Sequence, residues 1–193
     1  MDKIIKKIIT EDLSGVNITQ ITRGNCIVRL YEELLNFHNI VDAIGTTGNM
    51  VLLLPTQKDV ETTGHWVAVL FDKDTNTINH WDSYGLNWKQ ERAYSNNEYI
   101  KEHLLGNLYR KAINEGYKVI YNQHRLQKMS NGINTCGRWV STRVRFSYLS
   151  NNEFAELFLN QKYSPDYLVS LLTFFSITDD ITYEKDIIAT MKS

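Results

Sequence analysis

Residues 65 to 83 constrain the fold more than any other part of the sequence. Two apolar runs, HWVAVLFD and TNTINHWDS, have the composition of strands, and the segment DKDTN that joins them is rich in the Asp and Asn residues that favour turns. The pattern therefore predicts an antiparallel hairpin. In this hairpin His65 lies roughly opposite Asp82 or Ser83, because antiparallel strands pair residues at equal distances from their turn.

The elements around this hairpin indicate the fold class. We expect helices over residues 3–12, 28–44 and 88–115, strands over 49–56 and 117–127, and a helix that begins at Cys136 and is followed by two helical pieces that break at Ser164 and Pro165. Helices, strands, a helix, a strand and more helices, in that order, predict an α+β domain. Its centre is a mostly antiparallel sheet flanked by helices.

Length and composition are those of an ordinary globular chain. With 193 residues, 42% of them hydrophobic and 22% charged, we expect a single domain over residues 1–193. We expect the tail after about residue 176, which carries TDDITYEKD, to be flexible. A net charge of −1 gives no reason to expect a nucleic-acid or anionic membrane partner, and the start of the chain has the pattern of an amphipathic helix rather than a signal peptide.

One of only two cysteines stands at the start of a predicted helix. In NTCGRWVSTRVRFSYL, apolar residues recur at helical spacing after Cys136, so its thiol lies at the positive end of the helix dipole, which favours thiolate. Cys26 and Cys136 form no disulfide framework, and we expect both to be reduced. A nucleophilic cysteine also needs a base, a group that orients the base, and donors for an oxyanion.

The sequence offers a candidate for each of these roles. His65 begins a strand, Asp82 can lie beside it as the orienting acid, and Gln127 precedes Cys136 by nine residues, near enough to act as an oxyanion donor together with the backbone N–H of Cys136. A plainer interpretation of each residue exists, since a cysteine before an apolar helix is usually buried packing. His80 is the alternative base.

A zinc site is the weaker chemical alternative. His65, His80 and Cys136 are all zinc-ligand types, but no paired spacing such as Cys-x-x-Cys is present. We therefore expect neither a metal nor another cofactor.

Four segments carry a resemblance to a known group of enzymes. GHWVAVLFD, INHWDSYG, RLQ and NTCGRWV, in that order within residues 64–140, resemble the adenain-like and ubiquitin-like-protein proteases, which have His-Trp, an acid followed by Ser, a Gln, and Cys-Gly at a helix start. The segment LQ…S…TCGRWV, which contains Gln127 and Cys136, is most similar to the small maturation proteases of virophages and related double-stranded DNA viruses. Gln127 stands further from Cys136 than the usual oxyanion Gln does, so Gln123 remains a competitor.

The resemblance implies a function and a set of partners. It implies the adenain-like fold and a cysteine endopeptidase in which Cys136, His65, Asp82 and Gln127 are catalytic. It also implies that Trp66 shields the catalytic pair and, with Gly137, contributes to a tight substrate tunnel. The expected substrate is a viral capsid or core precursor, cut by a monomer in the virion and the host cytoplasm, without secretion or a membrane partner.

Several alternatives remain open at this point. The same residues are found in proteases that remove a ubiquitin-like modifier and in acyltransferases that use acetyl-CoA. A virion protein with a decayed site is a third alternative. The resemblance leaves open whether an activating peptide or DNA is needed.

Overall fold

The centre of the protein is a five-stranded sheet. A computed structural model describes residues 2–56, 64–91 and 103–177, together with residues 186, 187, 189 and 191. Within these residues the strands are β1 (Ile27–Leu30), β2 (Asn49–Pro55), β3 (Gly64–Asp72), β4 (Thr77–Trp81) and β5 (Lys118–Tyr121), and they lie in that order across the sheet. The two inner pairings are antiparallel, whereas β1 pairs with β2 and β4 with β5 in parallel. The α+β class is confirmed, and the sheet is mixed rather than mostly antiparallel.

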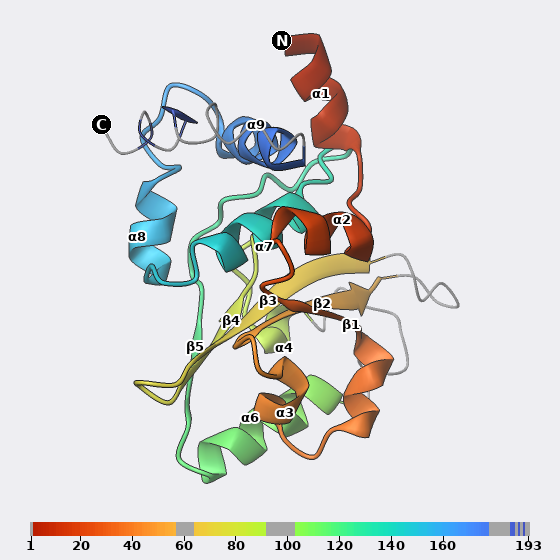
Figure 1. Ribbon diagram of the computed structural model, residues 1–193, viewed down its shortest axis with the longest axis vertical. Coiled ribbons are helices and arrows are strands. Elements are labelled where there is room, and N and C mark those ends of the chain that lie inside the picture. Colours follow the sequence, from red (N-terminus) through yellow and green to blue (C-terminus); the bar gives the residue numbers. More distant parts are fainter. Residues whose placement is uncertain are drawn as a thin grey trace.

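Helices cover both faces of this sheet (Figure 1). One layer consists of α1 (Asp2–Thr10), α2 (Gly15–Ile21), α7 (Cys136–Arg145), α8 (Asn151–Glu156) and α9 (Pro165–Ile177). The other consists of η1 (Tyr31–Asn36), α3 (Ile40–Ile44), α4 (Trp88–Glu91) and α6 (Leu104–Asn114). Each layer closes its own apolar core against the sheet. No helix within the described ranges is both long and apolar enough to cross a membrane.

Strand β2 shows why the sequence produces a sheet that is covered by helices on both faces. Val51 and Leu53 belong to the core on the α7 side, and Met50, Leu52 and Leu54 belong to the core on the opposite side. Successive strand residues point to opposite faces, so a strand with an uninterrupted apolar run from Met50 to Leu54 must be covered on both. The predicted buried strand is confirmed.

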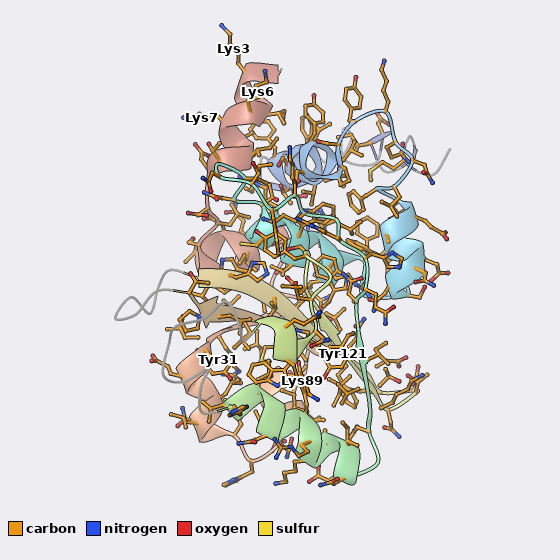
Figure 2. All side chains as sticks on the ribbon, turned by 180° about the vertical axis from the view of Figure 1, so that it is seen from behind. Lys3, Lys6, Lys7, Tyr31, Lys89 and Tyr121 are labelled. Carbon is orange, nitrogen blue, oxygen red and sulfur yellow. The ribbon has the colours of Figure 1, made fainter. Side chains whose placement is uncertain are left out.

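The first helix is amphipathic, as predicted. Ile5 and Ile8 are buried, whereas Lys3 and Lys7 are exposed and point away from the rest of the molecule (Figure 2). The apolar face of α1 packs against α9, so helices from the two ends of the described chain are in contact. This contact brings the segment after α1 close to the start of α7.

The prediction of a single helix over 28–44 is wrong. Its first residues form β1, which pairs with β2 from Ile27 opposite Met50, and η1 follows. Asn39 then starts α3 by accepting a hydrogen bond from the Asp42 backbone N–H at 2.8 Å. Pairing with a fully buried strand outweighs the local helical spacing of the apolar residues. Tyr31 instead packs in the core on the α6 side, where Figure 2 shows it in the same layer as Tyr121.

The predicted strand over 117–127 is too long. Strand β5 ends at Tyr121, and the backbone N–H groups of Leu126 and Gln127 both donate to the Ser83 carbonyl at 2.9 Å. These two N–H groups therefore hold a turn and do not continue the pairing of β5 with β4. The predicted β3–β4 hairpin, the helix from Cys136 and the break before α9 are confirmed. Residues 92–102 of the predicted helix over 88–115, and residues 178–185 of the tail, lie outside the described residues.

Candidate active site

Four elements bring the predicted site residues to one end of the sheet. His65 is the second residue of β3, Asp82 follows β4 directly, Gln127 lies in the segment after β5, and Cys136 is the first residue of α7. A cavity of about 680 Å³ is lined by His65, Gln127 and Cys136, among other residues. Asp82 lies behind His65 and is fully buried. The structure therefore brings all four residues together.

The imidazole of His65 is fixed on two sides. Its Nε2 is hydrogen-bonded to Asp82 Oδ1, while Asp82 Oδ2 accepts the Leu86 backbone N–H at 3.0 Å. The Tyr84 ring stacks on the imidazole with centroids 4.8 Å apart and planes 20° apart. An ionised carboxylate only accepts hydrogen bonds, so Nε2 carries the hydrogen and Nδ1 is left for Cys136.

Burial and charge act in opposite directions on this pair. Burial lowers the pKa of His65, but the charge of Asp82 and hydrogen bonds to Asp82 and Cys136 outweigh it and raise that pKa well above its usual value. Burial raises the pKa of Asp82, but the charge and hydrogen bond of His65 and two backbone N–H donors bring it below the usual value. The two groups therefore favour an imidazolium–carboxylate pair.

The amide of Gln127 is oriented by the residue after Asp82. The Ser83 hydroxyl donates to Gln127 Oε1 at 2.6 Å, and the Ser83 carbonyl holds the Gln127 backbone N–H. Asn122 Nδ2 braces the same turn by donating to the Asp82 carbonyl at 2.7 Å. Because Ser83 occupies the amide oxygen, the amide NH₂ is the group left to face the cavity. This role of Ser83 is not predicted from the sequence, although the acid followed by Ser in INHWDSYG is a signal that could have revealed it.

The two glutamines that compete for the oxyanion role lie in different surroundings. Gln127 is buried and lines the cavity with Cys136, whereas Gln123 is exposed and is not part of the described cavity wall. The sharp turn that holds this segment needs Gly85, whose φ is +70° and where a Cβ would approach the His124 carbonyl carbon to 3.0 Å. The geometry favours Gln127.

Cys136 lies where two cavities meet. The second, of about 520 Å³, shares Asp12, Gly64, Asn134 and Cys136 with the first. Cys136 is 9% exposed as a whole residue. An extended chain can thus lie across the sulfur with one part in each cavity, as a peptide substrate requires.

Trp66 and Gly137 both pack against Leu13 at the start of α7. Trp66 Nε1 donates to the Leu13 carbonyl at 3.0 Å, and the ring lines the second cavity. A Cβ on Gly137 would lie 2.8 Å from Leu13 Cβ and 3.3 Å from Trp66 Cδ1. Gly137 is buried and lies outside both described cavity walls. Its small size allows the loop after α1 to close over the start of α7, which is a packing role.

His80, the alternative base, belongs to the other core. It is fully buried, and its Nδ1 is hydrogen-bonded to the Tyr109 hydroxyl at 2.8 Å on the α6 side of the sheet. Within the described ranges, no group of three His, Cys, Asp or Glu side chains is placed to hold a metal ion.

Comparisons with known proteins give one relative in sequence. The chain is 31% identical over 179 residues to an uncharacterized protein, V9, of Sputnik virophage, across 83% of this chain and 93% of V9. This chain belongs to the V9 family. No protein-family model matches the chain.

Two solved structures align with this chain at low similarity. ChlaDub1 from Chlamydia trachomatis has a TM-score of 0.44 and 9% identity, with 96% of this chain and 90% of that one covered. The C-terminal Ulp1 protease domain, solved in complex with Smt3, the yeast ortholog of SUMO, has a TM-score of 0.36 and 14% identity, with 91% and 73% covered.

Proposed function

We propose that this protein is a cysteine endopeptidase that cleaves viral capsid or core precursors during virion maturation. The observation that carries the proposal is the meeting of the Cys136 thiol, the His65–Asp82 pair and the amide of Gln127 at one cavity. A base held by an acid and placed beside a thiol is the arrangement that activates a cysteine nucleophile.

In the first half of the reaction Cys136 attacks the scissile carbonyl carbon. His65 Nδ1 holds the proton that the thiol gives up, and Asp82 stabilises the resulting imidazolium. The Gln127 amide and the Cys136 backbone N–H donate to the oxyanion of the tetrahedral intermediate. When this intermediate collapses, the C–N bond breaks, His65 protonates the leaving amine, and a thioester to Cys136 remains.

Water completes the cycle by hydrolysing the thioester. His65, now neutral, removes a proton from a water molecule, which attacks the thioester carbonyl. The same two donors stabilise the second oxyanion. The C–S bond then breaks, the acid product leaves, and the proton on His65 returns to the sulfur.

The viral setting is supported by the relative in Sputnik virophage and by the resemblance of the segment around Gln127 and Cys136 to virophage maturation proteases. The natural partner in this proposal is a precursor polypeptide extended across Cys136. The enzyme would act as a monomer in assembling virions and in the host cytoplasm where they assemble.

Mass spectrometry of a capsid precursor incubated with the protein tests the proposal. We expect new peptide termini with wild-type protein and none with Cys136→Ala. Fluorogenic ubiquitin-like modifiers and acetyl-CoA with acceptor peptides are assayed in parallel. Turnover of a modifier substrate or acetyl transfer without precursor cleavage would identify one of the two rival activities instead.

Gln127→Ala tests the oxyanion donor. Loss of one such donor typically lowers turnover about a hundred- to a thousandfold, and we expect this loss with little change in KM, since the donor acts mainly in the transition state. Gln123→Ala is the matched control because that side chain is exposed, and it should retain wild-type turnover. Steady-state kinetics with a cleaved peptide measures both, and a reversed result would assign the role to Gln123.

A further inference from the structure

A buried carboxylate outside the four motifs connects the two segments that carry the proposed oxyanion donors. Asp166, in the first turn of α9, is only 4% exposed. Its Oδ1 accepts the Thr135 hydroxyl at 2.5 Å and the Trp139 indole N–H at 3.0 Å. Its Oδ2 accepts the Lys128 backbone N–H at 2.9 Å. One side chain thus receives hydrogen bonds from three separate groups.

The positions of these partners suggest what the carboxylate does. Lys128 directly follows Gln127, and Thr135 directly precedes Cys136. The loop between them runs along the first cavity, so its two ends are joined through Asp166 rather than to each other. The distance between the Gln127 amide and the Cys136 N–H therefore depends on a residue of α9.

Thr135 supplies a second, independent observation. It occupies the N-cap position of α7, where a threonine usually accepts a backbone N–H of the first turn, yet it makes no side-chain cap bond. Its hydroxyl donates to Asp166 instead. The first-turn N–H groups of α7 thus receive no cap from this side chain, which suits a helix start that must bind an oxyanion.

We propose that Asp166 is a positioning residue that sets the geometry of the oxyanion hole by holding Thr135 and Lys128 together. The proposal rests on the proposed hydrolase function. Asparagine at this position keeps the size of the side chain but replaces one acceptor oxygen by an NH₂ donor. At least one of the three donors then faces another donor, and one segment must shift.

Two reactions of the Cys136 thiol distinguish misplaced oxyanion donors from a general loss of structure around the site. Acylation by p-nitrophenyl acetate develops an oxyanion and needs the donors, whereas alkylation by iodoacetamide is a displacement at a saturated carbon and does not. Because small misplacements at a reacting centre can cost about a hundredfold in rate, Asp166→Asn should slow acylation by about tenfold to a hundredfold. Its alkylation rate should stay close to that of wild type.

Further variants make the test independent of the folding of Asp166→Asn. Thr135→Val should show the same selective loss of acylation, and Thr135→Ser, which keeps the hydroxyl, should restore it. In the Asp166→Asn background Thr135→Val should add little, since both changes remove one interaction. Ser170→Ala is the matched control one turn along α9, where the buried hydroxyl has no hydrogen-bond partner among the described residues, and both rates should remain unchanged.

The outcomes distinguish this proposal from the proposed function. If wild-type protein and Cys136→Ala react alike with both reagents, the hydrolase assignment fails. If Cys136 reacts in wild-type protein but the Asp166 and Thr135 variants acylate as fast as wild type, or lose both rates in equal proportion, the positioning role is overturned. A selective loss of acylation in either variant supports it.

Discussion

Cys136→Ala is expected to abolish precursor cleavage while leaving the fold intact. The substitution removes the sulfur that forms the thioester, so no covalent route remains, and loss of a nucleophile typically lowers turnover by about 10⁴-fold or more. Cys136 belongs to the core on the α7 side but also lines both cavities, so the loss of its sulfur leaves little new enclosed space. We therefore expect a change of about 1 kcal/mol or less in the free energy of unfolding. Product mass spectrometry and denaturant unfolding measure the two effects.

Cys26 provides the matched control. It is buried beside α2, and burial raises the pKa of its thiol more than the hydrogen bond with Thr22 lowers it. A protonated, enclosed thiol is a poor nucleophile, so Cys26→Ala should retain full cleavage activity. Iodoacetamide near neutral pH should label Cys136 first. Faster labelling of Cys26, or an active Cys136→Ala protein, would contradict the assignment.

The sequence predicted best those elements whose local pattern agrees with their tertiary contacts. The apolar runs of β2 and β3 bury both faces, and the Asp-rich turn before Thr77 closes the β3–β4 hairpin. The helix that begins at Cys136 has Gly137 in its first turn and packs its apolar face against β3. Local propensity, period and burial point to the same structure in each case.

The segments that were mispredicted depend on partners distant in the sequence. Ile27 to Leu30 form a strand only because β2 provides an edge for parallel pairing, and no local feature reveals that edge. The chain after Tyr121 leaves the sheet because the Ser83 carbonyl takes two of its N–H groups. Gln123 and Gln127 therefore lie beyond the strand that was predicted to contain both of them, although the geometry favours Gln127.

The contact between His65 and Asp82 was predictable because a hairpin brings the residues at its two open ends close together. The register places Ala68 opposite Trp81, so the ladder ends before Asp82, and the contact of His65 with Asp82 is diagonal rather than directly across. The prediction had the right partners with a register shifted by one or two residues. Asp166 could not be found in this way, because it reaches the site through the packing of α9 against α7.

His65→Ala should lower turnover by about 10⁴-fold, near the upper end of what general acid–base catalysis contributes, because no other described group takes its place beside Cys136. Asp82→Asn should retain more activity, since an amide can still accept the hydrogen bond from Nε2 but provides no charge. The pKa of His65 is raised well above 6.5 mainly by Asp82, against the effect of burial. The alkaline limb of the kcat/KM profile should therefore lie well above pH 6.5 in wild-type protein and shift to lower pH in Asp82→Asn.

The same pair makes the stability of the fold depend on pH, with opposite signs at the two ends. The lowered pKa of Asp82 contributes stability that is lost as the pH falls through it, below the ordinary value of 3.8. The raised pKa of His65 contributes stability that is complete below 6.5 and is lost as the pH rises through the folded-state value. The free energy of unfolding, measured with urea, should therefore differ most between wild type and Asp82→Asn at pH values between the folded-state pKa of Asp82 and that of His65. Parallel stability curves, together with an unshifted alkaline limb, would show that His65 and Asp82 do not act as a pair, and would overturn the orienting role of Asp82.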